Sequence, residues 1–258
     1  MTLAVFYSFA RSGGTLVNRC LGAIPGNLVL SEVNPHGALV PVEVQARDWL
    51  GLVGPGEFEI LAGKGYGAKI RWLSEAAANQ GRHLVVRDWP ALNFLSGLFS
   101  EYFQPSLLLE QQLYLTRHGL APPSAVVARR GAAVYESVVR TFDHLRDLTA
   151  EAFGAAYLAY ARVMDGRPVI RFEEFCREPQ RELARLCGWL GIAYSDGFLE
   201  GFPAFDRCTG DNRVSVSSRA GSSERIEVLP ENRGSPAWVA AARDPACREA
   251  DQVFGYAD

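Results

Sequence analysis

Residues 3–23 read Leu-Ala-Val-Phe-Tyr-Ser-Phe-Ala-Arg-Ser-Gly-Gly-Thr-Leu-Val-Asn-Arg-Cys-Leu-Gly-Ala, and they contain the strongest structural signal in the chain. The apolar run from Leu3 to Ser8 predicts a buried strand, and apolar residues at helical spacing predict a helix from Leu16 to Ala23. A strand, a glycine-containing turn and a helix in this order gather free backbone amides at the positive end of the helix dipole. The first turn is therefore predicted to bind an anion such as phosphate.

The rest of the chain alternates short apolar runs with longer helical patterns, which predicts an α/β fold. The further strands are expected at Leu28 to Ser31, His83 to Arg87, Ala125 to Ala128 and Pro168 to Phe172. The further helices are expected at Ala68 to Ala78, Leu107 to Leu115, Ala132 to Phe142, Leu148 to Val163 and Gln180 to Leu190. With 258 residues and 48% apolar content, we expect a single domain over 1–258, with a mainly parallel sheet between two helical layers.

Two segments depart from this alternation. Gly51 to Gly67 contains Gly-Pro-Gly and Gly-Lys-Gly and is predicted to be a mobile connection. Cys208 to Arg233 is rich in Ser, Arg, Gly and Asn. A polar stretch of that length is typical of a disordered segment or a ligand-binding loop.

Composition excludes several classes of partner. The net charge of −3 and the pI near 5.9 provide no overall positive field for nucleic acid or an anionic membrane. The amino-terminal apolar run meets Arg11 before it becomes long, so we expect no membrane anchor and a cytoplasmic location. The five cysteines are widely spaced without a Cys-x-x-Cys pair, which predicts free, mostly buried thiols and no zinc site.

The first turn differs from the nucleoside-triphosphate loop G-x-x-x-x-G-K-[ST]. Ser8 stands at its first glycine position and Gly14 at its lysine position, while the cation lies three residues earlier, at Arg11. This displacement disfavours a magnesium-dependent kinase, which would lose its main contact to the transferred group.

Tyr7 to Leu16 resembles instead the 5′-phosphosulfate loop of the sulfotransferase family, Pro-(Lys/Arg)-Ser-Gly-Thr-Thr followed by an apolar or aromatic residue. Ala10 replaces the family's proline and Gly14 its first threonine, and neither change removes a charge. The resemblance implies 3′-phosphoadenosine 5′-phosphosulfate (PAPS) as sulfuryl donor and adenosine 3′,5′-bisphosphate (PAP) as product, without a metal. Arg11 would neutralise the oxygen that bridges phosphate and sulfate, and the 5′-phosphate would bind Ser12, Gly13, Gly14, Thr15 and Leu16. The plainer reading is an ordinary turn with a surface arginine.

A second resemblance concerns the 3′-phosphate of the donor. In the family it is held by an arginine at a strand end and a serine on the next helix, and Ser137 follows Arg129 here by the family's spacing of eight positions. Arg130 could take the role of Arg129. A late family loop also covers this phosphate, and Arg213, Ser217 and Arg219 would supply its donors here.

A third matching segment, Val169 to Phe175 followed by Arg177-Glu178-Pro179, indicates architecture. Phe172 replaces a family tyrosine. We expect Glu173 and Glu174 to position neighbouring loops.

The base that removes the acceptor's proton is not fixed by the sequence. Many small-molecule members of the family use a histidine where this chain has Trp89. Other branches use a glutamate after the first βα unit, which favours Glu32 at the end of the second strand, where ligands of open α/β sheets collect. Asp88 and His36 are the alternatives.

The segment 40–104 is expected to form the acceptor pocket. Its rings suit an apolar or aromatic small molecule that offers a hydroxyl or amine, and suit an ordinary core equally. They are Trp49, Phe58, Tyr66, Trp72, Trp89, Phe94, Phe99, Tyr102 and Phe103. Lysines and arginines are scattered over this segment without forming a cluster, which argues against a sulfated polysaccharide as the acceptor. The leading prediction is thus a sulfotransferase, with a degenerate kinase or a non-catalytic nucleotide-binding module as alternatives, and the oligomeric state, including a homodimer, stays open.

Overall fold

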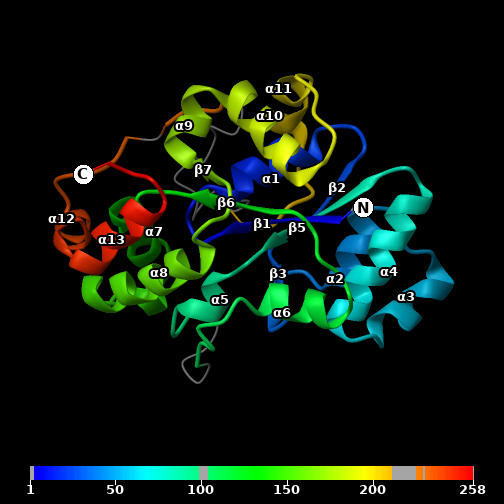
Figure 1. The fold of residues 1–258 in the computed structure, drawn as a ribbon, viewed down its shortest axis with the longest axis horizontal. Helices are drawn as coiled ribbons and strands as arrows, with labels where there is room; N and C mark the ends of the chain where they lie inside the picture. Colours follow the sequence, from blue (N-terminus) through cyan, green and yellow to red (C-terminus); the bar gives the residue numbers. More distant parts are fainter. Residues whose placement is uncertain (1–2, 99–103, 211–224, 229, 258) are drawn as a thin grey trace.

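A five-stranded parallel sheet runs through the centre of the molecule (Figure 1). The computed structural model describes residues 3–98, 104–210, 225–228 and 230–257. The strand order is β2-β5-β1-β6-β7, which places β1 between β5 and β6. The strands are β1 (Leu3–Ser8), β2 (Asn27–Leu30), β5 (His83–Asp88), β6 (Ser124–Ala128) and β7 (Val169–Arg171).

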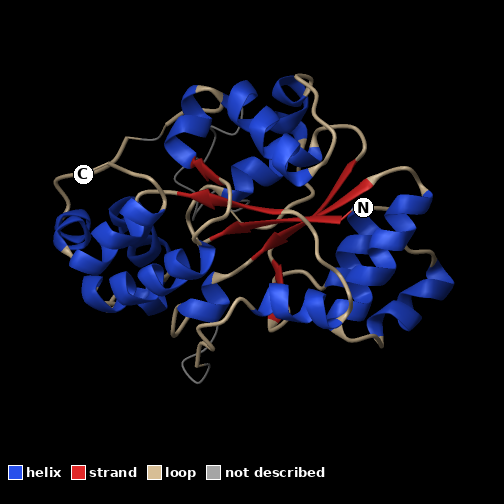
Figure 2. Cartoon of the chain, in the orientation of Figure 1, coloured by secondary structure: helices blue, strands red, loops and turns tan. Residues whose placement is uncertain are grey.

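Helices cover both faces of the sheet (Figure 2). The helices on one face are α1 (Gly14–Gly22), α9 (Phe172–Arg177), α10 (Pro179–Leu190) and α11 (Phe198–Gly201). Those on the other are α4 (Tyr66–Asn79), α5 (Ala91–Phe94), α6 (Glu110–Arg117), α7 (Gly131–Thr141), α8 (Ala150–Met164), α12 (Pro236–Arg243) and α13 (Pro245–Val253).

The side chains of β1 alternate between the two apolar cores. Ala4 and Phe6 pack on the face of α1, whereas Val5 and Tyr7 pack on the opposite face. Because successive side chains of a strand point to opposite faces, a strand covered on both sides must be apolar throughout. This is why the continuous apolar run at the start of the chain becomes the central strand.

The predicted three-layer α/β architecture is confirmed. Each of the five predicted strands and six predicted helices lies within a few residues of an observed element. All five cysteines are buried thiols, as expected. None of the helices within the described ranges is both long and apolar enough to cross a membrane.

The prediction of a mobile connection over Gly51 to Gly67 was wrong, because α3 (Pro55–Ala62) forms there. Pro55 occupies the first helical position, where its missing amide hydrogen costs nothing. Glu57 caps the helix, since its carboxylate accepts from the Gly54 amide at 2.9 Å. The glycines and proline thus mark the start of a helix.

The region after β2 holds short elements that periodicity could not indicate. A hairpin of β3 (Val33–Asn34) and β4 (Gly37–Ala38) leads into α2 (Val42–Val44) and a π-helical turn (Gln45–Trp49). Short 3₁₀ turns lie at Asp143–Leu145 and Phe202–Ala204.

Two C-terminal helices complete the helical layer on the α7 and α8 face of the sheet. α12 and α13 each begin with a capped proline turn, in which Ser235 accepts from the Trp238 amide and Asp244 from the Cys247 amide. They pack beside α7 and α8 (Figure 1). The sequence interpretation did not include them.

Candidate cofactor-binding and active site

The first turn presents backbone amides to one point at the start of α1. Ser12 donates its amide to the Phe9 carbonyl at 3.1 Å, and Leu16 donates its amide to Gly13 at 3.1 Å. Within the described residues, the amides of Gly13, Gly14 and Thr15 have no acceptor. Three adjacent free amides at a helix N-terminus form a site for an anion.

Glycine is required at both glycine positions of this turn. Gly13 has a φ of 88° and lies so close to Phe172 that a Cβ atom would stand 2.0 Å from the ring. A Cβ atom on Gly14 would stand 2.1 Å from the Ser8 hydroxyl oxygen. The turn is thus packed against β1 and the start of α9, with no space for a side chain.

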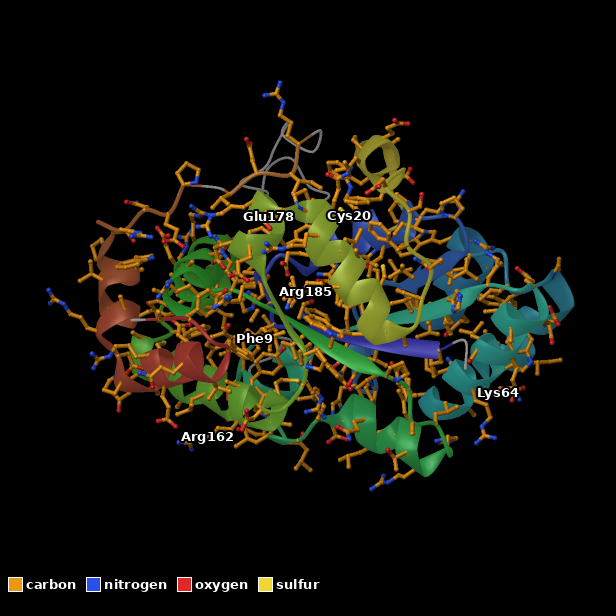
Figure 3. The ribbon with its side chains drawn as sticks, turned by 45° about the horizontal axis from the view of Figure 1, so that its top comes forward. Phe9, Cys20, Lys64, Arg162, Glu178 and Arg185 are labelled. Carbon is orange, nitrogen blue, oxygen red and sulfur yellow. The ribbon has the colours of Figure 1, made fainter. Side chains whose placement is uncertain are left out.

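Phe9 anchors the turn from the other face. Its buried ring contacts the rings of Tyr157 and Tyr160 with centroids 5.2 and 5.1 Å apart. Figure 3 shows Phe9 in the interior, whereas Arg162 points outward from α8. Aromatic packing of this kind fixes the chain directly before Arg11.

Arg11, Arg129 and Ser137 meet beside the first turn. The Arg11 guanidinium donates through Nε to the Ser137 hydroxyl at 2.9 Å. Arg129 donates through Nη1 to the Arg11 carbonyl at 3.2 Å. Arg11 lies more than a hundred positions from the other two residues in the chain, yet the structure brings the predicted 5′-phosphosulfate loop and the predicted 3′-phosphate pair to one place.

Arg129 is a half-buried cation that has no carboxylate partner within salt-bridge distance among the described residues. Its guanidinium lies over the Phe172 ring, 5.5 Å from the centroid. Burial lowers the pKa of Arg129, with Glu173 acting in the opposite direction. A half-buried charge without an ion pair loses part of its hydration, so an anionic ligand would compensate it. Arg130 instead points to the carbonyl of Ala257, which leaves Arg129 as the arginine facing the first turn.

Arg87 belongs to the same site, although sequence reasoning missed it. It is only 5% exposed and pairs with Glu32, with Nη2 and Oε1 2.8 Å apart. Its Nε lies 3.5 Å from the Ser8 hydroxyl oxygen. Nη1 donates to the Thr209 carbonyl at 3.4 Å. A charged residue directly after the apolar run Leu84 to Val86, at the end of a predicted buried strand, was the signal that could have revealed it.

The structure places Glu32 beside the first turn. Its second carboxylate oxygen accepts from the Thr209 hydroxyl at 2.5 Å, and its backbone has a φ of 50°, a conformation that side-chain-bearing residues rarely adopt. Such backbone geometry often occurs at functional sites. Glu32 therefore lies next to Arg87, whose Nε approaches the Ser8 hydroxyl at the end of β1, directly before the first turn.

The two alternative bases lie on the opposite side of the sheet. Asp88 follows Arg87 directly, so the strand alternation turns it to the other face, where Asn34 donates to its Oδ1 at 3.0 Å. Burial raises the pKa of Asp88 to about 7, and its Oδ2 has no partner in the described part of the chain. His36 lies in the β3–β4 turn, with Nε2 3.6 Å from Glu110 of α6.

Asp88→Asn is expected to remove a pH-dependent loss of stability. The pKa of Asp88 is raised on folding, so its contribution favours the folded state below about pH 4 and declines as pH rises through about 7. Urea unfolding at pH 5.5 and at pH 8 measures the free energy of unfolding of both proteins. The difference between variant and wild type should shift in favour of the variant by roughly 1–3 kcal/mol at the higher pH. An equal difference between the two proteins at both pH values would contradict this assignment.

The aromatic residues of segment 40–104 pack mainly as core. All those that the structure describes belong to, or lie against, the apolar core on the α4 and α8 face: Trp49, Phe58, Tyr66, Trp72, Trp89 and Phe94. Phe99, Tyr102 and Phe103 lie outside the described residues. The prediction that this segment lines an acceptor pocket stays a prediction.

The start of the predicted covering loop contacts the first turn. Thr15 donates its hydroxyl to the Thr209 carbonyl at 3.4 Å, and a Cβ atom on Gly210 would stand 2.2 Å from that hydroxyl oxygen. Arg213, Ser217 and Arg219 lie outside the described residues. Among the described residues, no group of His, Cys, Asp and Glu could hold a metal ion.

Comparison with known proteins identifies the fold. No family model and no curated protein sequence matches the chain. The sulfotransferase domain of the Synechococcus PCC 7002 olefin synthase is similar over 99% of this chain and 95% of its own, with 17% identity and a TM-score of 0.60. The sulfotransferase domain of the curacin biosynthetic pathway is similar over 100% of this chain and 99% of its own, with 16% identity and a TM-score of 0.48. Mouse SULT7A1 complexed with PAP is similar over 98% of this chain and 83% of its own, with 12% identity and a TM-score of 0.47. The chain has a sulfotransferase fold.

Proposed function

We propose that the protein is a sulfotransferase that moves the sulfuryl group of PAPS to a hydroxyl or amine of a small-molecule acceptor. The observation that carries this proposal is the meeting of Arg11, Arg129 and Ser137 around the free amides of the first turn. A donor with phosphates at both the 5′ and 3′ positions needs two anion sites at a fixed spacing. One guanidinium beside each site supplies the charge.

The residues of the first turn would act on the leaving oxygen. In an in-line displacement, the acceptor's oxygen or nitrogen forms a bond to sulfur while the bond from sulfur to the bridging oxygen breaks. Arg11 and the turn amides stabilise the negative charge that develops on that oxygen and leaves with PAP. Arg87, buried beside Ser8, holds Glu32 on the same side.

Glu32 would accept the proton that the acceptor loses. Its carboxylate is held by Arg87 and by the Thr209 hydroxyl, so its orientation is fixed before the acceptor binds. A base needs hydrogen-bond reach to its proton, and a positioned carboxylate of this kind commonly contributes about 10² to 10⁴ in rate. Of the three candidate bases, Glu32 is the one beside the first turn.

The test of this proposal is nucleotide binding by an Arg129→Ala variant. We expect its affinity for PAP to fall about 100-fold, because a buried, charge-assisted contact to phosphate is lost. Its affinity for adenosine 5′-monophosphate, which lacks the 3′-phosphate, should change less than about twofold. Isothermal titration calorimetry measures both, and Arg140→Ala, on the exposed end of the same α7 helix, is the matched control.

Two results would reject the proposal. If wild type binds both nucleotides equally, the 3′-phosphate site does not exist. If turnover requires magnesium and a nucleoside triphosphate, the protein is a kinase. Binding of PAP without sulfuryl transfer to any hydroxylated or amino acceptor would favour a non-catalytic nucleotide-binding module.

A further inference from the structure

The turn between β6 and α7, residues 128–131, is held at four consecutive backbone positions by side chains from elsewhere. Two of these contacts come from the body of the fold. The Tyr157 hydroxyl of α8 donates to the Arg129 carbonyl at 2.6 Å. Glu173 of α9 accepts from the Arg130 amide at 3.4 Å, which confirms the expectation that this glutamate positions a neighbouring loop.

The other two contacts come from the C-terminal end of the chain. Asp251 of α13 accepts from the Gly131 amide at 2.7 Å. The Tyr256 hydroxyl donates to Glu173 Oε2 at 2.6 Å, with the Ala128 carbonyl as a second, longer acceptor at 3.3 Å. Tyr256 thus contacts the turn directly at Ala128. It also fixes Glu173, which binds the turn at Arg130, on the other side of Arg129.

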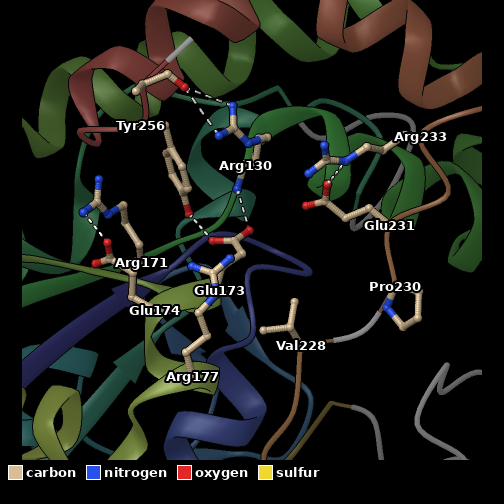
Figure 4. A pocket seen from close by; sticks show the side chains of 11 residues that line it. Arg130, Arg171, Glu173, Glu174, Arg177, Val228, Pro230, Glu231, Arg233 and Tyr256 are labelled. Atoms are coloured by element: carbon tan, nitrogen blue, oxygen red, sulfur yellow. Dashed lines mark hydrogen bonds and ion pairs between the residues drawn. The ribbon is translucent and has the colours of Figure 1, made fainter.

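The tail around Tyr256 is itself bound on both sides. Its ring lies between two guanidiniums, with centroid distances of 5.0 Å to Arg130 and 5.7 Å to Arg171. Arg171 donates to the carbonyl of Gly255, and Arg130 to that of Ala257. Tyr256, Arg130 and Arg171 line a cavity of about 510 Å³. Figure 4 shows Tyr256 pointing to Glu173 in this cavity.

These contacts fix the backbone at Arg129 while its side chain stays available. The four holding groups bind main-chain atoms of the turn, whereas the guanidinium of Arg129 points to the carbonyl of Arg11. A cation binds a phosphate tightly only when its direction is set beforehand, because ordering it during binding costs conformational entropy. The C-terminal residues supply that order from a distance.

We propose that Tyr256 and Asp251 are positioning residues for the 3′-phosphate of the nucleotide, so that the C-terminal segment is part of the cofactor site. The inference rests on the proposed function. Neither residue touches the nucleotide. Their effect is confined to ligands that carry a 3′-phosphate, because their hydrogen bonds go to the 128–131 turn and to Glu173, whereas the first turn, which binds the 5′ side, packs through Phe9 and Phe172.

The test compares two nucleotides in Tyr256→Phe. The variant keeps the ring between the guanidiniums and loses only the hydroxyl, so we expect its Kd for PAP to rise about tenfold. Its Kd for adenosine 5′-monophosphate should stay within about twofold of wild type. Tyr194→Phe is the matched control, since it also removes a hydroxyl bound to a carboxylate, on the exposed chain after α10.

A second pair of variants separates positioning from general destabilisation. Asp251→Ala removes the acceptor of the Gly131 amide and should weaken PAP binding about tenfold, whereas Asp251→Asn retains an oxygen there and should restore it to within about threefold. Hydrogen exchange of the Arg130 and Gly131 amides should accelerate in Tyr256→Phe and Asp251→Ala, with exchange in α4 unchanged.

The outcomes distinguish this inference from the proposed function. If wild type prefers PAP and Tyr256→Phe keeps the full preference, the positioning role is wrong while the function stands. Equal weakening of both nucleotides in Tyr256→Phe would also overturn it, because the residue would then be merely structural. If wild type shows no preference for PAP, the function fails and the positioning role fails with it.

Discussion

Arg11→Ala is expected to lower kcat/KM for sulfuryl transfer by about three orders of magnitude, the largest effect of any single change in the first turn. Arg11 is the only side-chain cation within the turn itself, and it lies between the free amides and Ser137. Charge that develops on the leaving oxygen would lose its nearest guanidinium. The positive φ of residue 11 is equally strained for arginine and alanine, so the stability should change little.

Steady-state kinetics with PAPS and a responsive acceptor measures this loss. Arg11→Lys keeps the charge and loses the fork of donors, so it should retain an intermediate activity. Arg140→Ala, the exposed control on α7, should be indistinguishable from wild type. Wild-type kcat/KM in Arg11→Ala, in a protein that melts normally, would remove the first turn from the active site.

Glu32→Gln is expected to reduce kcat by about 10² to 10⁴, because the amide cannot accept the acceptor's proton. The Gln oxygen can still accept from Arg87, so the hydrogen bond is kept while the negative charge of residue 32 is lost. PAP affinity should change less than about threefold. This combination, lower kcat with unchanged nucleotide binding, is typical of a lost base and not of a disrupted site.

Asp88→Asn and His36→Gln serve as the parallel variants. Both residues lie across the sheet from Glu32, and neither change should lower kcat by more than about threefold. A large loss of kcat in Asp88→Asn, together with normal kcat in Glu32→Gln, would transfer the role of base to Asp88. Melting curves of each variant separate a lost base from a lost fold, since Glu32 holds the buried Arg87.

The strands and the first turn could be predicted from the sequence because they depend on local patterns. A continuous apolar run followed by Ser-Gly-Gly-Thr indicates a strand, a turn and a helix, whatever the rest of the chain does. The spacing from Arg129 to Ser137 is local in the same way, since a strand end and the next helix fix it. α3 was missed for a local reason too, as its glycines and proline were interpreted as a connection instead of a helix start.

The surroundings of the candidate site could not be predicted because they join distant parts of the chain. Arg87 meets Thr209 across 122 positions, and Tyr256 meets the Ala128 carbonyl across 128. No periodicity reports such contacts. They arise only when β5 lies next to β1 and α13 packs on α8.

The order of the amino acids alone was enough to predict the central strand, the glycine-containing turn after it and the charged residues near that turn. Which of these charged residues share a site depended on how the whole chain packs. Strand alternation separates the adjacent Arg87 and Asp88 to opposite faces, and the parallel order of β5, β1 and β6 places the face of Arg87 beside the first turn. The direction in which a side chain points within a strand or helix follows from its position in that element. Which other element lies next to it depends on the packing of the whole chain.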